Sequence, residues 1–212
     1  MKYKFYIDTH KGATFIYILS LLYIYEAFDN IFALVYLALH GSYGIFWVLK
    51  SKLFPDKTWE VKVPFYYGLI IWIGLSFYWI APWIIVSEIF YKTESILNGE
   101  IIILFSILLY VFGVFLHFTS DMQKFIQLKT QPGQLINDGL FKRCRNINYF
   151  GELLIYSAFA LLSMHWIPWV VLLLFIIFIW VPNMVRKDKS LSRYENFEDY
   201  KKDSKLLIPF IY

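Results

Sequence analysis

Residues 101–118 read IIILFSILLYVFGVFLHF and contain no Asp, Glu, Lys or Arg. A helix needs about 20 mainly apolar residues to cross the hydrocarbon core of a membrane, which is roughly 30 Å thick. This run therefore predicts a transmembrane helix. Hydrophobic residues make up 59% of the whole chain, a share that is high for a soluble domain.

Other apolar runs lie on both sides of this stretch. Counted with it, the runs occupy residues 13–28, 31–49, 63–87, 100–118, 149–164 and 167–184. They predict an all-α fold, a polytopic membrane bundle of about six transmembrane helices. The runs at 13–28 and 149–164 are the shorter ones, so we expect the hairpin formed by the last two runs to be tilted or to span incompletely.

The positive charges alternate between the connections. All but one of the 20 Lys and Arg residues fall in four segments, which are 1–12, 50–62, 119–148 and the tail from 185. Lys92 alone lies in the opposite set of connections. Because cytoplasmic loops carry the Lys and Arg excess, this pattern predicts that both termini are cytoplasmic. The net charge of +4 then reflects topology and attraction to anionic lipid, with no case for nucleic acid as a partner.

The length of the chain, 212 residues, leaves no room for a separate soluble catalytic domain. Its single cysteine, Cys144, has no internal partner for a disulfide, and we expect an inert thiol. The outer connections contain no cluster of metal ligands, and no metal is predicted. Any chemistry is therefore expected on the two long inner segments, 119–148 and 185–212, which flank the last hairpin.

Polar residues with helical spacing stand where these segments meet the apolar runs. His117 and Asp121 are four residues apart, as are Asn148 and Glu152, so each pair shares one face of a helix. A carboxylate such as Glu152, just inside an apolar run, is usually paired or functional. Its expected ion-pair partners are Arg143, Arg145 or Arg186. The alternative is a simple ion pair at the depth of the lipid headgroups.

The tail adds a stripe of cations. Arg186, Lys189 and Arg193 are three and four residues apart, so a continuing helix would place them on one face. Arginine forks and lysine ammonium groups both recognise phosphate. Lipid headgroup binding is the alternative interpretation of such cations near a membrane.

Several short motifs follow one another in the half of the chain from residue 105 to residue 212. They are Ser120-Asp121, Gly139-Leu140-Phe141, Asn148-Tyr149-Phe150-Gly151-Glu152, Arg186–Tyr194, Tyr200 and Leu207–Tyr212. By these motifs this half resembles the C-terminal domain of the steroid 5-alpha-reductase family, and their order and spacing make the resemblance more specific than any one of them alone. Residues 1–104 would then be the lipid-facing and substrate-facing transmembrane half.

In that family the C-terminal half binds NADPH on the cytosolic side. Hydride then passes to a conjugated carbon–carbon double bond of a steroid, an enoyl thioester or another lipid. The resemblance implies a cofactor pocket lined by His117, Asp121, Arg145, Asn148, Tyr149, Glu152, Arg186, Lys189 and Tyr194. It also implies the endoplasmic reticulum, although a mitochondrial membrane satisfies the same charge rule.

The chain departs from the family pattern in its N-terminal half. There, members supply a Tyr and a Glu that polarise the carbonyl group of the substrate. Tyr43 is similar to the Tyr, with His40 as a second candidate catalytic residue. Glu26 is expected near the outer face, so the Glu is not placed. A Tyr-Arg pair often found before the Gly-Leu-Phe turn is replaced by Gln134 and Leu135.

Two other functions stay open. Membrane methyltransferases of the isoprenylcysteine carboxyl type bind S-adenosylmethionine, and their Arg-His-Pro-x-Tyr pattern is similar to residues 145–149. Asn146 and Ile147 replace the His and Pro, which favours the reductase. Alternatively, the chain is an accessory subunit of a larger membrane complex that keeps the family fold without its activity.

Overall fold

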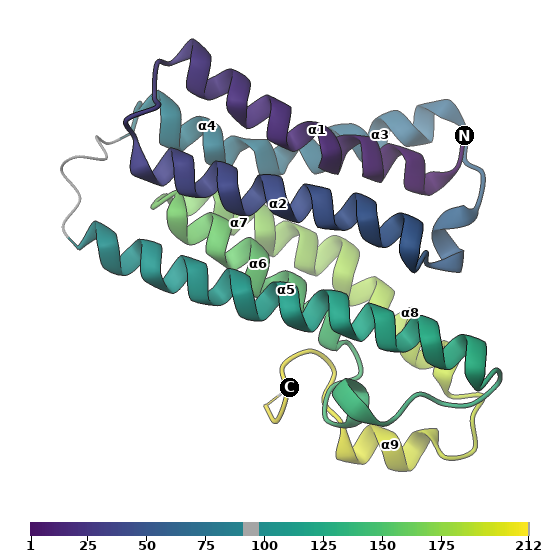
Figure 1. Cartoon of the computed structure of the whole chain (residues 1–212). Helices are drawn as coiled ribbons and strands as arrows, with labels where there is room; N and C mark the ends of the chain where they lie inside the picture. Colours follow the sequence, from purple (N-terminus) through teal and green to yellow (C-terminus); the bar gives the residue numbers. More distant parts are fainter. Residues whose placement is uncertain (91–97, 212) are drawn as a thin grey trace. The chain divides into compact units, whose positions relative to one another are not determined.

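The fold is that of a computed structural model, which describes residues 1–90 and 98–211. Lys92, the cation predicted on the outer side, lies outside the described residues. Apart from two isolated β-bridges, the regular structure in the described part is helical (Figure 1), which confirms the all-α prediction. The α-helices are α1 (Tyr3–Ile24), α2 (Ile31–Leu53), α3 (Phe65–Ser76), α4 (Ile80–Ser87), α5 (Gly99–Thr130), α6 (Ile147–Leu162), α7 (Trp166–Phe175), α8 (Val181–Leu191) and α9 (Phe197–Asp203).

Helices long and apolar enough to cross a membrane confirm the multi-pass prediction. By length and composition, four stretches of the described residues qualify, and they are Ile31–Leu53, Phe65–Ser87, Gly99–Thr130 and Trp166–Leu191. Helix α6 is apolar but has 16 residues, which at 1.5 Å per residue reach about 24 Å. Helix α1 begins ten residues before the apolar run at 13–28, and its first half carries charged side chains. The count of six spans stays a prediction.

Two of the long stretches change their helical geometry near a proline. A 3-10 turn, η2 (Phe77–Trp79), joins α3 to α4 ahead of Pro82, and a π-helical turn (Ile176–Trp180) joins α7 to α8 ahead of Pro182. Because proline has no N–H, the carbonyl four residues earlier loses its helical partner. The neighbouring turn adjusts its hydrogen-bonding pattern in response.

The chain forms two compact units that interleave in the sequence. Unit 1 contains residues 1–110 and 157–172, and unit 2 contains residues 111–156 and 173–212. The sequence-based division at residue 104, into a substrate half and a cofactor half, stays a prediction.

In unit 1, α1 and α2 run antiparallel side by side (Figure 1). Asn30 begins α2, and its side-chain oxygen accepts hydrogen bonds from the backbone N–H groups of the first turn. At the other end, Lys2 forms an isolated bridge with Lys62, and the ammonium groups of Lys2 and Lys4 bind Glu60. Two of the segments predicted to be cytoplasmic, 1–12 and 50–62, therefore meet at one end of this unit.

Unit 2 joins the other two segments predicted to be cytoplasmic. The Arg145 N–H donates to the Lys205 carbonyl at 2.9 Å, and the Lys205 N–H donates to the Arg143 carbonyl at 3.0 Å. These bonds form a parallel bridge between Cys144 and Lys205. The loop before α6 and the segment after α9 are thus held together, which agrees with the prediction that the two segments flanking the last hairpin meet. Which side of the membrane they face stays a prediction.

Candidate functional site

Two glycines let α5 and α6 touch backbone to backbone within unit 2. A Cβ atom on Gly151 would lie 2.5 Å from the backbone nitrogen of His117 and 2.8 Å from the carbonyl oxygen of Gly113. Small residues allow this close approach between helices in a membrane. The contact brings the middle of α5 against the first turns of α6, where several of the predicted pocket residues lie.

His117, Asp121 and Asn148 come together at this contact. The side chain of His117 is buried, and its Nδ1 lies 3.1 Å from the Asn148 carbonyl oxygen. Because a carbonyl only accepts, Nδ1 carries the hydrogen. On the other side of the ring, Nε2 lies 3.9 Å from Oδ2 of Asp121. The two helices therefore place three of the predicted residues in one polar group.

The side chains of Asn148 and Glu152 follow on the same face of α6. The Oδ1 atom of Asn148 is buried, and among the described residues it has no hydrogen-bond partner. Buried polar atoms are almost always hydrogen-bonded, so this acceptor is suited to an N–H donor of a bound ligand. Glu152 lies one turn later and is half-buried. We call His117, Asp121, Asn148 and Glu152 the α5–α6 polar group.

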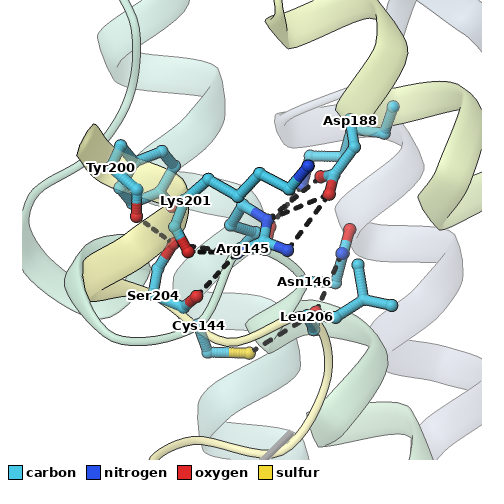
Figure 2. A network of polar contacts seen from close by, with 9 residues as sticks. Cys144, Arg145, Asn146, Asp188, Tyr200, Lys201, Ser204 and Leu206 are labelled. Atoms are coloured by element: carbon cyan, nitrogen blue, oxygen red, sulfur yellow. Dashed lines mark hydrogen bonds and ion pairs between the residues drawn. The ribbon is translucent and has the colours of Figure 1, made fainter. Parts of the chain in front are cut away.

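Arg145 lies just before α6 and is 5% exposed. Its Nε is 3.1 and 3.2 Å from the two carboxylate oxygens of Asp188 on α8, and its Nη2 is 3.1 Å from Oδ2 (Figure 2). Its Nη1 donates to the Ser204 carbonyl at 2.6 Å and to the Lys201 carbonyl at 3.4 Å. We call this arrangement the Arg145 clamp. The carboxylate that Arg145 binds is therefore Asp188, whereas the sequence named Arg145 as one of three expected partners of Glu152.

The neighbours of Arg145 tie the same loop to the tail. The Asn146 side chain donates from Nδ2 to the Leu206 carbonyl at 2.9 Å, and the Cys144 thiol donates to the Leu207 carbonyl at 3.0 Å. Burial raises the pKa of the Cys144 thiol to about 11, so the thiol is neutral at physiological pH. Lys187 donates from Nζ to the Arg145 carbonyl at 2.6 Å. The loop before α6 is therefore fixed from both α8 and the tail.

The other predicted residues of the tail lie on a more exposed surface. Arg186 and Lys189 are exposed on α8, and the guanidinium of Arg186 donates to Asn183 and to a carbonyl of its own helix. Helix α8 ends at Leu191, so Arg193 does not continue the stripe, and its guanidinium donates to the Tyr194 hydroxyl at 3.1 Å. A further predicted residue, Tyr149, packs its ring 5.6 Å from that of Trp180.

His40 and Tyr43 belong to unit 1 and are both buried. His40 Nδ1 lies 3.0 Å from the Tyr36 hydroxyl. The Lys11 ammonium donates to the Tyr43 hydroxyl at 3.3 Å. Glu26 is exposed in the connection between α1 and α2, and its place near the outer face of the membrane stays a prediction.

Sequence reasoning missed the partners that set these positions. In the sequence, Asp188 and Lys11 belong to charged segments and Gly113 belongs to an apolar run, so none of the three stands out. A weak signal existed for Asp188, because a carboxylate within a basic stretch is a natural ion-pair partner. For Lys11 the only signal was its position close to the start of the first apolar run, which begins at residue 13.

Comparison with known families agrees with these features. A family model described as 3-oxo-5-alpha-steroid 4-dehydrogenase matches residues 66–212, which is more than half of the chain. The match begins in α3, well before residue 105, from which the resemblance was drawn. No curated protein and no solved structure matches the chain. The chain, with its multi-pass apolar helices, therefore belongs to the steroid 5-alpha-reductase family of oxidoreductases.

Proposed function

We propose that this protein is a membrane-embedded, NADPH-dependent reductase of a conjugated carbon–carbon double bond in a steroid or another lipid. Membership of the family supports the reaction class. The observation that carries the proposal is the α5–α6 polar group, with the buried acceptor of Asn148 at its centre. When bound, NADPH supplies a hydride.

The donors and acceptors of unit 2 fit a dinucleotide. The Asn148 side-chain oxygen would accept a hydrogen bond from an amide or amine of the cofactor. The carboxylates of Asp121 and Glu152 suit hydroxyl groups of a ribose, since an ionised carboxylate only accepts. The exposed cations Arg186 and Lys189 suit the phosphates.

Arg145 has a different role in this proposal. Its guanidinium is directed at Asp188 and at carbonyls of the segment that follows α8. We assign it the positioning of the loop that carries Asn146 and leads into Asn148. Contact with the phosphates is assigned to Arg186 and Lys189 instead.

On the substrate side, Tyr43 and His40 are the candidate catalytic residues. Hydride addition at the β-carbon of an enone moves negative charge onto the carbonyl oxygen. A hydrogen-bond donor held in a site without water stabilises that charge strongly. Tyr43→Phe would then slow turnover sharply, by roughly 100-fold.

Thermal unfolding of the detergent-purified protein with NADPH, NADH or S-adenosylmethionine tests the cofactor. A ligand that binds only the folded state adds about 2.7 kcal/mol at 100 times its dissociation constant. We expect stabilisation by NADPH. Stabilisation by S-adenosylmethionine alone would instead support the methyltransferase alternative.

Glu152→Gln tests the pocket itself. The change keeps the size of the side chain and removes its charge, so we expect weaker NADPH binding with little change in the melting temperature of the ligand-free protein. Glu198→Gln is the matched control, because Glu198 is an exposed carboxylate on α9. Equal NADPH affinity in Glu152→Gln and wild type would remove Glu152 from the pocket.

One observation favours a second function. Glu26 is exposed in a connection, so the carboxylate that the family uses beside its tyrosine is not placed. An accessory subunit of a larger membrane complex would not need it. In that case none of the three ligands raises the melting temperature, and the protein co-purifies with partner subunits from endoplasmic reticulum or mitochondrial membranes.

A further inference from the structure

Unit 1 contains a buried lysine that the proposed reaction has not yet used. Lys11 is 4% exposed although it carries an ammonium group. Its Nζ lies 3.3 Å from the Tyr43 hydroxyl oxygen, 4.4 Å from the centre of the Tyr43 ring and 4.7 Å from that of Trp47. Lysine is almost never fully buried unless it is paired, so a buried lysine is a candidate for a functional role.

The backbone fixes this arrangement. A Cβ atom on Gly44 would lie 2.2 Å from the carbonyl oxygen of Lys11, so α1 and α2 are in direct backbone contact at this level. A side chain at position 44 would push α1 away from α2. Glycine at this position therefore lets Lys11 reach Tyr43, the residue just before Gly44. The Lys11 side chain is held over Tyr43 by the packing of two helices, not by a mobile loop.

The same face of α2 carries a row of buried aromatic and polar side chains. Tyr36, His40, Tyr43 and Trp47 are spaced by four, three and four residues, and all are buried. His40 stacks on Phe159, with ring centres 4.1 Å apart, and its Nδ1 faces the Tyr36 hydroxyl. Two polar pairs, Lys11–Tyr43 and His40–Tyr36, thus lie along one helix face. Of the two, only the pair that contains Lys11 includes an ammonium group.

The direction of the hydrogen bond shows which of the two groups is the donor and which is the acceptor. An ammonium group only donates, so the Tyr43 oxygen is the acceptor and its own O–H hydrogen is directed elsewhere. A cation at this distance in a low-dielectric interior strongly stabilises negative charge on the oxygen. The arrangement therefore favours donation of the Tyr43 proton to an oxygen that is becoming negative.

We propose that Lys11 is the positioning residue that makes Tyr43 a proton donor to the oxo group of the lipid substrate. This inference rests on the proposed reductase function and adds a positioning residue on α1 to the candidate catalytic residue on α2. Lys11 acts through Tyr43 and does not itself contact the substrate.

The step balances as follows. Hydride adds to the β-carbon, and the π electrons of the double bond shift onto the oxo oxygen. The O–H bond of Tyr43 breaks, and its proton forms an O–H bond on that oxygen, which gives an enol and leaves a phenolate beside the Lys11 ammonium. The enol becomes the saturated ketone when its α-carbon takes a proton from water and its oxygen releases one. Tyr43 regains a proton from water, so the substrate gains one hydride and one proton.

The test uses two lipids that differ only in the oxo group, cholest-4-en-3-one and cholest-4-ene. Melting temperatures of the full-length protein in detergent are measured with each lipid, for wild type, Lys11→Met, Lys11→Arg, Tyr43→Phe and Lys50→Met. Lys50 is the matched control, because it is also buried and its Nζ lies 4.6 Å from the centre of the same Trp47 ring. Lys11→Arg keeps the cation and should rescue the effect.

We expect the enone, but not the alkene, to raise the melting temperature of wild type, Lys11→Arg and Lys50→Met by roughly 3 °C or more. Lys11→Met and Tyr43→Phe should lose this difference. An equal difference in Lys11→Met, or none in wild type, overturns the proposal. If Lys11→Met does not fold, loss of the difference in Tyr43→Phe with its retention in Lys11→Arg supports the proposal, and retention in Tyr43→Phe overturns it.

The NADPH melt separates this inference from the proposed function. If NADPH stabilises wild type and Lys11→Met alike while the enone difference does not depend on Lys11, only the role of Lys11 fails. If NADPH stabilises neither protein, the reductase function fails. In an activity assay, Lys11→Met should lower kcat roughly tenfold or more and change the apparent affinity for NADPH little.

Discussion

At the scale of single residues, the buried guanidinium of Arg145 depends on one carboxylate. The Arg145 and Asp188 side chains are 6% and 17% exposed, so water cannot replace either partner easily. Removing one partner of a buried ion pair leaves an uncompensated charge, which is far more costly than losing a surface pair.

Asp188→Asn should therefore destabilise the protein strongly. We expect the free energy of unfolding to fall by about 3 kcal/mol, and the melting temperature to fall by roughly 6–12 °C. The control is Asp199→Asn, which breaks an ion pair with Lys202 whose side chains are 83% and 75% exposed. That change should alter the free energy of unfolding by less than about 0.5 kcal/mol. Similar melting temperatures for the two variants would contradict the buried role of Asp188.

Cys144 gives a second prediction at this scale. In the folded protein its pKa is raised to about 11 from an ordinary value of 9.0, chiefly by burial. At pH 8 the folded protein should therefore react slowly with iodoacetamide, and denatured protein much faster. Because this is the single cysteine of the chain, total alkylation measures it directly. Rapid alkylation of folded protein would show that the loop before α6 is open.

The same shift predicts a dependence of stability on pH. The unfolded thiol loses its proton first as the pH rises, so ionisation favours the unfolded state. Stability contributed by the neutral thiol is complete below about pH 9 and is lost as the pH rises toward about 11. Across this range the melting temperature of wild type should fall relative to that of Cys144→Ala as the pH rises.

At the scale of elements, the close contact of α5 and α6 sets the geometry of the polar group. A side chain on Gly151 would meet the backbone of α5 and not a flexible side chain. The helices would have to move apart, which would separate His117 from the Asn148 carbonyl. Overpacking of this kind typically costs 1–3 kcal/mol.

Gly151→Ala should consequently lower the free energy of unfolding by about 2 kcal/mol and weaken NADPH binding as well. Gly74→Ala is the matched control, because a Cβ atom there meets nothing within 4 Å. That variant should be neutral or more stable by up to about 1 kcal/mol, since alanine is favoured over glycine in a helix. Unchanged NADPH affinity in a destabilised Gly151→Ala protein would separate the contact from the cofactor pocket.

At the scale of the whole molecule, the charge pattern predicts a single orientation in the membrane. The segments 1–12 and 50–62 meet within unit 1, and the loop before α6 meets the tail within unit 2. These contacts agree with the predicted grouping of the segments. Which side of the membrane they face is a prediction from the Lys and Arg excess.

Site-directed labelling tests this orientation. In a Cys144→Ala background, Lys57→Cys and Lys189→Cys should react with a membrane-impermeant maleimide only from the cytoplasmic side. Asp29→Cys, in the connection between α1 and α2, should react only from the opposite side. Labelling is compared in sealed and permeabilised vesicles. Reaction of the two lysine positions from opposite sides would contradict the predicted topology.

Much of the fold followed from consecutive residues. Every predicted apolar run overlaps a helix, from α1 to the stretch that ends in α8. The grouping of His117 with Asp121, and of Asn148 with Glu152, also followed from helical spacing. The start of α1 did not, because charged side chains such as Lys4, Asp8 and Lys11 interrupt its first half, so the apolar run begins ten residues after the helix does.

The order of the residues was enough to predict which stretches are helices suited to lipid, how the charges group, and which family the motifs belong to. These are local properties, since the free energy of transfer into lipid and the spacing along a helix depend on neighbouring residues. The folded arrangement was needed to show that Arg145 binds Asp188, that Gly151 lies against Gly113, and that Lys11 reaches Tyr43. Helical spacing names the face of each helix, but the packing of one helix on another selects the partner.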